Sequence, residues 1–547
     1  MRTARVLFVA ILTAAAAATA VDLFVDDILG DNARTGTAAA PGTGNAGSLR
    51  TIRRAIALAR PGDTINLVPG RVYAEEVIWE SAGGTLGNPV TLAGNGAVID
   101  GSEPCAPDGW VPVQAGVWRY AGAHATSIIL VNDRAVPEYR VAPDLAAGEF
   151  CYEFDGHQSV LFYRPPADAV LTDQVIEAGL NNGETIRLAV ARWRPAGGIL
   201  TCGQVLRPAW MTVNGRPALL VTAADRLPAG GWADTPAGFC FRPAPGTTPA
   251  DHAVRRAVRA NGLAVRGAAS HVTIRDLNVR GVWNDGFNVH GTVTGVRFLN
   301  CRARDCGDEG FSAHDASEVE LDGGLFLRCS SGVFNVNTAG VTVTRNLIAV
   351  ACRIRGYGAL HGVPGVRHIL EHAVLADNPV QIEAGYLSAT DVLMVASGDV
   401  PAGWALEAAG PLIIDRLTAA GYRDQVKVTT REGPVTVRSS LFPGPAGVWA
   451  VAGPDPFAVL GLIDVGVAAG SVLVTMPERT VQPLDPAGGV AELARVFVIR
   501  GPDFLRQIAA ADRPASLTRA GCTAGLWERY FAVMSDPDPD AVRGDQP

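Results

Sequence analysis

Two acidic segments occupy matching places in neighbouring stretches of the chain. Asn284-Asp285 and Asp308-Glu309 are each followed by Gly-Phe and then, after two more residues, by a histidine. Two carboxyl groups held close together cannot both ionise cheaply, so one keeps a proton and an acid/base pair results. A separation of about 5–5.5 Å between the two groups suits cleavage of a glycosidic bond with retention of configuration. On this interpretation Asp285 is the nucleophile and Glu309 the acid/base, with Asp308 as the competing choice.

The same residues have two other interpretations. Asn, Asp and Gly before an aromatic residue are what a tight turn uses, so both segments could be purely structural. Calcium binds through several oxygen atoms at once, and Asn284, Asp285, Asp308 and Glu309 could supply them. The residues alone leave all three interpretations open.

Histidines recur beside the acids. His290, His314, Asn337 and His361 follow one another at intervals of 23 or 24 residues, with Asn337 taking the place of a histidine. We predict that they form one outward row, in which the histidines bind a substrate hydroxyl or carboxylate or position the acid. The alternative is an ordinary solvated row. Zinc is a further, weaker interpretation of stacked histidines.

Arginines recur in the same way. Arg280 and Arg304 occupy equivalent places in the repeat and are followed by Arg328. Because a guanidinium group pairs well with a carboxylate, this row could attract an anionic sugar, or it could simply balance the acids. Asn284 is also a predicted substrate-binding residue.

The spacing of these residues predicts the fold that must position them. The stretch from Val272 matches the stretch from Val296 at an offset of 24 without a gap, and two further copies follow. The pieces alternate apolar and polar residues, are rich in β-branched side chains and are separated by Gly, Asn and Asp, so each predicts a strand. Short strands at such a period are typical of a solenoid. We therefore expect an all-β parallel β-helix whose equivalent positions stack about 4.8 Å apart. Cys306, Cys329 and Cys352 recur every 23 residues and are predicted rungs of an inner ladder.

Three motifs carry a resemblance to a known superfamily. They are SLRTIRRAIALARPGDTINLVPGRVYAEEV from Ser48, GNPVTLAGNGAVIDGS from Gly87, and the pair NDGFNVHG and DEGFSAHD. With these motifs the chain resembles the right-handed parallel β-helix proteins of the pectate-lyase-like superfamily. The resemblance implies a right-handed β-helix and, because most members are secreted and act on polysaccharides, a polysaccharide or oligosaccharide substrate.

Composition and the N-terminus narrow the setting. Arg2 and Arg5 precede an apolar run and a small-x-small site at Ala18-Thr19-Ala20, which predicts a secretory signal peptide and a secreted protein. No later stretch is long and uncharged enough to span a bilayer, so we expect no membrane contact after cleavage. The net charge of −8 and the lack of a basic patch argue against a nucleic-acid partner. We expect a monomer.

Pattern changes along the chain predict its organisation. Between the first and the main coils the period disappears, and a longer motif occurs twice, with VNDR answered by VNGR and LFYRPP by FCFRPA. Helical spacing precedes the first coils and returns near the C-terminus, where helices could cover the open ends of the solenoid. Pairings among Cys105, Cys151, Cys202 and Cys240 are left open. The predicted segments are a signal peptide (1–20), an N-terminal capping helix with the first coils (21–104), an inserted pair of related β modules (105–260), the main β-helix (261–500), a helical C-terminal cap (501–534) and a disordered tail (535–547).

Together these features predict a secreted carbohydrate-active β-helix enzyme. A glycoside hydrolase that uses the stacked carboxylates is the first hypothesis, and it needs no cofactor. The second is a polysaccharide lyase that uses Ca²⁺, with an arginine such as Arg304 or Arg328 as the base. The third, from a different class, is a non-catalytic glycan-binding or surface β-helix.

Overall fold

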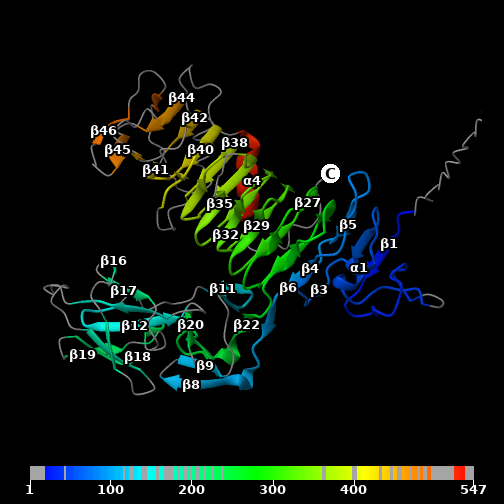
Figure 1. Ribbon diagram of the computed structural model, residues 1–547, viewed down its shortest axis with the longest axis horizontal. Coiled ribbons are helices and arrows are strands. Elements are labelled where there is room, and N and C mark those ends of the chain that lie inside the picture. Colours follow the sequence, from blue (N-terminus) through cyan, green and yellow to red (C-terminus); the bar gives the residue numbers. More distant parts are fainter. Residues whose placement is uncertain are drawn as a thin grey trace, which may run out of the picture.

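A computed structural model gives the structure of the protein (Figure 1). It describes residues 19–41, 45–114, 117–121, 128–136, 145–154, 159–165, 176–180, 185–188, 194–196, 199–203, 208–213, 216–220, 222, 226–235, 238–359, 365–396, 403–429, 434–443, 447–452, 459–468, 471–476, 481–484, 490–493 and 523–535. The predicted signal peptide, His361, Cys522 and the predicted tail lie outside these residues, apart from the last two residues of the signal peptide and Ser535, the first residue of the tail, which ends a helix. Among the described residues no helix is long and apolar enough to cross a membrane.

The repeat forms a parallel β-helix of three short strands per coil. One coil consists of β24 (Val272–Arg275), β25 (Asn278–Arg280) and β26 (Phe287–Val289). The next consists of β27 (Val296–Leu299), β28 (Arg302–Arg304) and β29 (Glu309–Asp315). Each strand pairs in parallel with its equivalent one coil on, as Ile274 with Phe298 and Phe287 with Phe311. The predicted offset of 24 is therefore confirmed.

The following coil shifts the register in its third strand. It contains β30 (Val319–Asp322), β31 (Leu325–Leu327) and β32 (Ser331–Asn337). Arg304 pairs with Leu327, but Glu309 pairs with Ser331, so the turn before β32 has one residue fewer. A shift of one residue turns a side chain to the other face of the strand.

Two expectations are corrected by this shift. Val336 pairs with His314, and Asn337 pairs with Asp315, so Asn337 is not a rung of the histidine row. Asn337 instead lies fully buried. The arginine row likewise ends at Arg304, because its partner is Leu327 and Arg328 falls in the turn.

The later coils follow the same pattern with longer strands. From β36 onward a single strand replaces the first two strands of the coil, since β36 pairs with both strands of the coil before it. The remaining strands of these coils are β33 (Val341–Arg345), β34 (Ile348–Val350), β35 (Arg355–Ala359), β36 (Arg367–Ala376), β37 (Val380–Ala384), β38 (Leu387–Val395), β39 (Leu406–Ala408), β40 (Leu412–Ala420), β41 (Asp424–Val428), β42 (Val435–Phe442), β43 (Val448–Ala452), β44 (Leu460–Ala468), β45 (Val472–Met476), β46 (Val481–Pro483) and β47 (Val490–Leu493).

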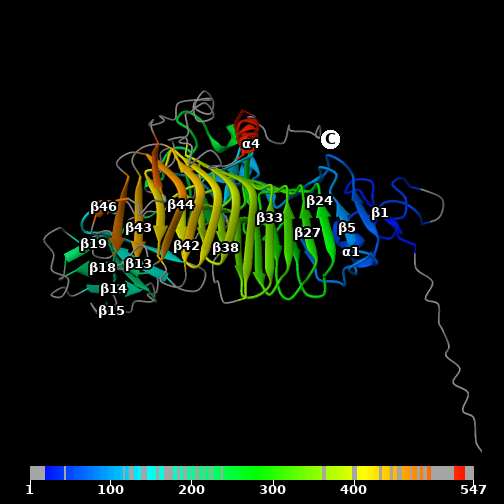
Figure 2. The ribbon, with the colours of Figure 1, turned by 90° about the horizontal axis from the view of Figure 1, so that it is seen from above.

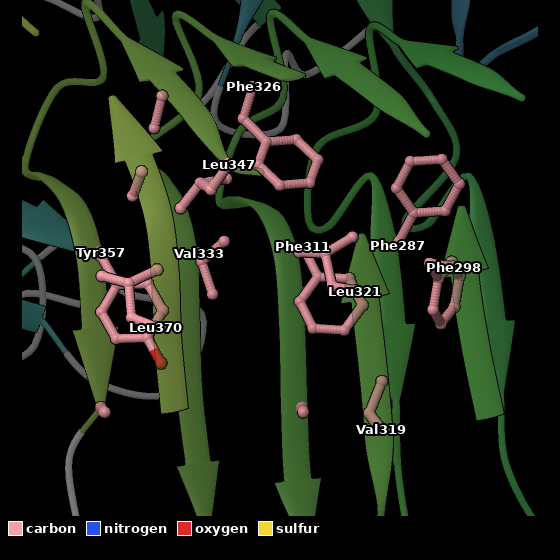
Figure 3. Close-up of a cluster of buried hydrophobic side chains, with 14 of the residues drawn as sticks. Phe287, Phe298, Phe311, Val319, Leu321, Phe326, Val333, Leu347, Tyr357 and Leu370 are labelled. Carbon is pink, nitrogen blue, oxygen red and sulfur yellow. The ribbon is translucent and has the colours of Figure 1, made fainter. Parts of the chain in front are cut away.

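The core runs along the axis of the solenoid as ladders of equivalent side chains. Figure 3 shows the rings of Phe287, Phe298, Phe311 and Phe326 pointing into this interior. The three repeated cysteines form the predicted inner ladder and are buried, free thiols. Burial raises the pKa of the Cys301 thiol to about 12, so this thiol stays protonated and unreactive. Cys105 is also a free thiol and forms none of the disulfides left open above.

The N-terminal coils begin with a short helix beside the first strands. Strand β1 (Asp22–Val25) pairs with β2 (Thr64–Leu67), and α1 (Ile52–Leu58) lies between them in the chain. Ile52, Ala55 and Ile56 bury one face of α1 in the core, as the sequence predicts, and its N-cap is Thr51. That α1 closes the end of the solenoid stays a prediction. The first coils continue with β3 (Val72–Tyr73), β4 (Val77–Trp79), β5 (Val90–Ala93) and β6 (Val98–Asp100).

The inserted region takes the place of one connecting turn between two strands of the solenoid. It leaves after β6, and the coil is completed only by β23 (Leu263–Val265), which pairs with β4 and β26. The two ends of the insertion, β7 (Ser102–Pro104) and β22 (Val254–Ala257), pair with each other, and β22 also pairs with β10 (Ile129–Val131) of the hairpin β10–β11 (Arg134–Val136). Figure 1 shows the rest of the insertion projecting away from the coils.

Each of the remaining sheets of the insertion contains strands from both predicted modules. One sheet joins β8 (Trp110–Gln114) and β9 (Val117–Ala121) to β20 (Trp232–Thr235) and β21 (Gly238–Phe241). Another joins β12 (Glu149–Phe154) and β13 (Ser159–Tyr163) to the hairpin of β18 (Pro208–Val213) and β19 (Arg216–Leu220). The same sheet includes β14 (Ile176–Leu180), β15 (Thr185–Leu188), β16 (Arg194–Ala196) and β17 (Ile199–Gly203). The modules therefore interlock instead of standing apart.

The C-terminal helix is present but covers a side of the solenoid. In α4 (Ala524–Ser535), Leu526 and Tyr530 pack against Val374 of β36 and Leu393 of β38. Figure 2 shows α4 away from both ends of the coils. The described part of the expected C-terminal cap thus protects apolar outer side chains in the middle of the solenoid.

Candidate active site

The acids sit at one corner of two successive coils. Asp285 ends the turn between β25 and β26, and Glu309 begins β29 one coil later. The Gly286 N–H donates to the carbonyl of Glu309 at 2.8 Å, so the two residues are neighbouring rungs, as predicted. A Cβ on Gly286 would lie 2.5 Å from the Ala303 Cβ, and only glycine lets the chain turn this tightly against the core.

Asp285 is a buried carboxylate held by neutral donors. Its side chain is 2 % exposed. Oδ2 accepts hydrogen bonds from the Ser312 hydroxyl at 2.7 Å and from the Asn288 amide, and Oδ1 accepts one from the Glu309 N–H at 3.1 Å. Three donors on one carboxylate fix its orientation.

Glu309 and Asp308 complete the acid cluster. One carboxylate oxygen from each of the three acids lies within 4.8 Å of the others. Burial, reinforced by the charges of Asp285 and Asp308, raises the pKa of Glu309 to about 11. Glu309 therefore carries a proton at neutral pH. Burial also raises the pKa of Asp308, whereas a hydrogen bond with Glu309 and the charge of Arg353 lower it. Of the three, Asp308 is the partly exposed one.

Two histidines of the predicted row are described, His290 and His314, and they lie beside the cluster as a stacked pair. The rings of His290 and His314 are 4.1 Å apart at 18°. His314 Nε2 lies 3.1 Å from the Ser312 hydroxyl, and His290 Nδ1 lies 3.4 Å from Asp315. Burial lowers the pKa of His314 and the neighbouring His290 lowers it further, so His314 is neutral at pH 7. Substrate binding by this pair stays a prediction.

The predicted arginines are engaged with buried aspartates. Arg280 Nε bonds Asp100 at 3.0 Å, and Arg304 Nη1 bonds Asp305 at 3.1 Å. Both arginines stack in register, as expected. Asn284 donates to the side chain of Asn261 at 3.0 Å, and its carbonyl accepts the Asp308 N–H at 3.1 Å, so it braces the acidic turns.

The hydrogen bonds of four residues near the acids were not predicted from the sequence. Asn288 and Ser312 bond Asp285 directly, and the offset of 24 that pairs them was the signal available for finding them. Ser331 follows Glu309 in the same row and is 1 % exposed. Arg353 reaches back over two coils to the carbonyls of Cys306 and Gly307, at 3.0 and 2.8 Å. No spacing pattern points to such a contact.

The insertion touches the corner that carries the acids. The Ala135 N–H of β11 donates to Asp305 at 3.0 Å, and Arg304 donates to the carbonyl of Asp133 at 3.1 Å. Trp283, next to Asn284, packs in one apolar cluster with Ile128 and Leu130 of the insertion. The root of the insertion therefore supports the turn that holds Asp285.

A family model matches the coils that carry these residues. Residues 256–358 match the model described as "Right handed beta helix region". The solenoid is a right-handed parallel β-helix. The matched stretch includes all three acids and the stacked histidines. No curated protein matches the chain.

Several solved structures are similar over most of the chain. A structure of XylC with xylose is 11 % identical, with 83 % of this chain and 84 % of that chain covered and a TM-score of 0.35. The GH136 lacto-N-biosidase from Eubacterium ramulus is 9 % identical, with 87 % and 67 % covered and a TM-score of 0.40. A rhamnogalacturonan lyase is 9 % identical, with 93 % and 98 % covered and a TM-score of 0.39. Likenesses this distant assign no activity to this chain.

Proposed function

We propose that the protein is a secreted glycoside hydrolase that cleaves a polysaccharide or oligosaccharide at the acid cluster. The observation that carries the proposal is the cluster of three acids, whose carboxylate oxygens lie within 4.8 Å of one another where burial raises the pKa of Glu309. The resemblance to polysaccharide-active β-helix proteins supports the substrate class. We further propose that the chain acts as a monomer.

The roles follow from exposure and protonation. Glu309 holds a proton and lies next to Asp308, the acid that reaches solvent. Glu309 donates this proton to the leaving oxygen, and a leaving alkoxide is a strong enough base to take it. Asp308 then faces the positive charge that develops on the sugar, as nucleophile or as stabilising carboxylate. Water then attacks the sugar and gives a proton to the Glu309 carboxylate, which releases the product and restores the acid.

Asp285 takes a different role from the one first expected. Both of its oxygens already accept hydrogen bonds, and at 2 % exposure it is more deeply buried than Glu309, which is 7 % exposed. It therefore acts as the fixed negative charge that keeps the proton on Glu309. Asp308, which is partly exposed, is the better candidate for direct contact with substrate.

The calcium-dependent lyase fits the cluster less well. Calcium takes six to eight oxygen ligands. The three acids offer one oxygen each, and three of the roughly four lone-pair sites of Asp285 already accept hydrogen bonds from Ser312, Asn288 and the Glu309 N–H. The donor set as arranged is thus one of hydrogen-bonded acids, and no step of the proposed reaction passes through a metal.

The test is a screen for released reducing ends over a panel of polysaccharides, with and without a chelator. We expect chelator-insensitive activity that falls by about 10²–10⁴-fold in Glu309→Gln. Glu318→Gln, an exposed glutamate in the same coil, is the matched control and should keep full activity.

Two results would overturn the proposal. Unsaturated products that vanish with chelator would indicate the lyase. Glycan binding without turnover, unchanged in Glu309→Gln, would indicate a non-catalytic glycan-binding or surface protein.

A further inference from the structure

A line of hydrogen bonds joins the acid cluster to the stacked histidines. It runs from Asp285 through the Ser312 hydroxyl to His314 Nε2, over contacts of 2.7 and 3.1 Å. Ser312 is fully buried, and the Asn288 amide also bonds its oxygen at 3.1 Å. The line continues by ring stacking to His290, which contacts Asp315.

The direction of each hydrogen bond follows from the donors available. A serine hydroxyl carries one hydrogen, and the short contact to the Asp285 carboxylate uses it. The contact from His314 must then be an Nε2–H that donates to the serine oxygen. A neutral ring has one N–H, so His314 Nδ1 carries none.

We propose that Ser312 and His314 are positioning residues of the acid cluster: the imidazole of His314 orients the Ser312 hydroxyl, and this hydroxyl fixes Asp285 against Glu309. The activity consequences rest on the proposed hydrolase. The proposed positions of Ser312 and Asp285 do not rest on it. Asp285 accepts the Glu309 N–H as well as the Ser312 hydroxyl, so it links the serine to the backbone of Glu309.

The same contacts exclude a nucleophilic serine. An attacking hydroxyl gives its proton to a base and meets the substrate. Ser312 instead donates to a carboxylate that two other donors also hold, and its side chain has no exposed surface. Its neighbours use the hydroxyl as a bridge.

The experiment compares Ser312→Ala with Ser312→Thr, which keeps a hydroxyl. Exchange of the Glu309 amide hydrogen should be about 10-fold faster in Ser312→Ala, because its acceptor Asp285 loses a donor worth about 1.4 kcal/mol, the equivalent of that factor. It should return toward the wild-type rate in Ser312→Thr. Ser440→Ala is the control, since Ser440 is equally buried and donates to the Arg438 carbonyl far from the acids.

A second variant tests the same contacts in case Ser312→Ala does not fold. His314→Phe keeps a flat ring against His290 and should speed the same amide exchange by a smaller factor. Nitrogen NMR of the histidines should show the Nε2–H form of His314 in the wild type and in Ser312→Thr. An unchanged Glu309 amide in Ser312→Ala would overturn the inference.

Activity separates this inference from the proposed function. On any glycan that the wild type cleaves, Ser312→Ala should lower kcat by about 10²-fold with KM little changed, as expected for a misplaced acid. If amide exchange responds but no glycan is cleaved, the inference stands and the proposed function fails. If Glu309→Gln abolishes turnover while Ser312→Ala changes neither kcat nor amide exchange, the proposed function stands and the inference fails.

Discussion

Two buried aspartates lie close together at the same corner of the solenoid, and their surroundings differ. Asp305 has no exposed side-chain surface and is paired with two cations, Arg328 through two bonds of 2.8 and 2.7 Å and Arg304 through one of 3.1 Å. Asp285 is equally hidden but is bonded only by neutral donors and lies against two further acids. One carboxylate is neutralised by its neighbours, and the other is left charged.

This difference separates a structural acid from a candidate functional one. A buried charge is tolerated when a cation and hydrogen bonds compensate it, and Asp305 meets both conditions while it anchors the insertion. Asp285 meets only the second condition. Burial raises the pKa of Glu309, and the neighbouring Asp285 carboxylate raises it further. Uncompensated charge near a group that holds a proton is typical of functional sites.

The largest expected loss of stability from a single substitution is at Asp305. Asp305→Asn leaves two guanidinium groups without their counter-charge, and removing one partner of a buried ion pair costs about 3–5 kcal/mol. We expect about 3 kcal/mol, because both arginines reach solvent in part. Denaturant unfolding measures it, and the Ala135 amide should lose its protection from exchange. Asp285→Asn should cost much less, and equal losses in the two variants would refute the distinction between the two aspartates.

The next effect is the pH dependence of stability. The pKa of Glu309 is raised from 4.5 to about 11, so the folded protein binds a proton that the unfolded chain releases. The stabilising contribution of Glu309 is complete below pH 4.5 and is lost as pH rises toward 11, with a slope of at most about 1.4 kcal/mol per pH unit. Unfolding midpoints measured across this range should fall for the wild type and stay flatter for Glu309→Gln. Identical profiles would show that Glu309 titrates normally.

The smallest effect is expected at Arg353. Arg353→Ala removes the bonds to the Cys306 and Gly307 carbonyls and a charge that lowers the pKa of Asp308. We expect a loss of about 1 kcal/mol, faster amide exchange at Asp308 and a higher pKa of Asp308. Arg345→Ala removes an exposed arginine that pairs with Glu320 and Glu371 away from the acids, and it should leave the Asp308 amide unchanged.

The strands were predictable from the sequence because the alternation of apolar and polar residues, repeated at a fixed period, indicates which side chains are buried. The register of Ile274 with Phe298 and the cysteine ladder followed directly from the offsets. The prediction failed at Asn337, where a shorter turn before β32 moved the register by one residue. Loop length is free to change between coils, so periodicity cannot fix it.

The stacking of the acidic residues on neighbouring coils was predictable from the sequence, but their hydrogen bonds were not. Stacking of Asp285 on Glu309 followed from the repeat. Which acid is exposed depends on side-chain contacts, and a lone serine such as Ser312 gives no sign in the sequence that it joins a carboxylate to a histidine. The reach of Arg353 across two coils depends on its rotamer.

The pairing of β7 with β22 has a consequence for how this chain can change. The insertion starts and finishes at adjacent points, so a short connection between the flanking segments would restore an ordinary turn without moving any coil. Whole β-rich regions can thus be gained, lost or exchanged there in a single genetic step while the stacked strands keep their alignment. Proteins with this architecture can vary the inserted region without altering the β-helix.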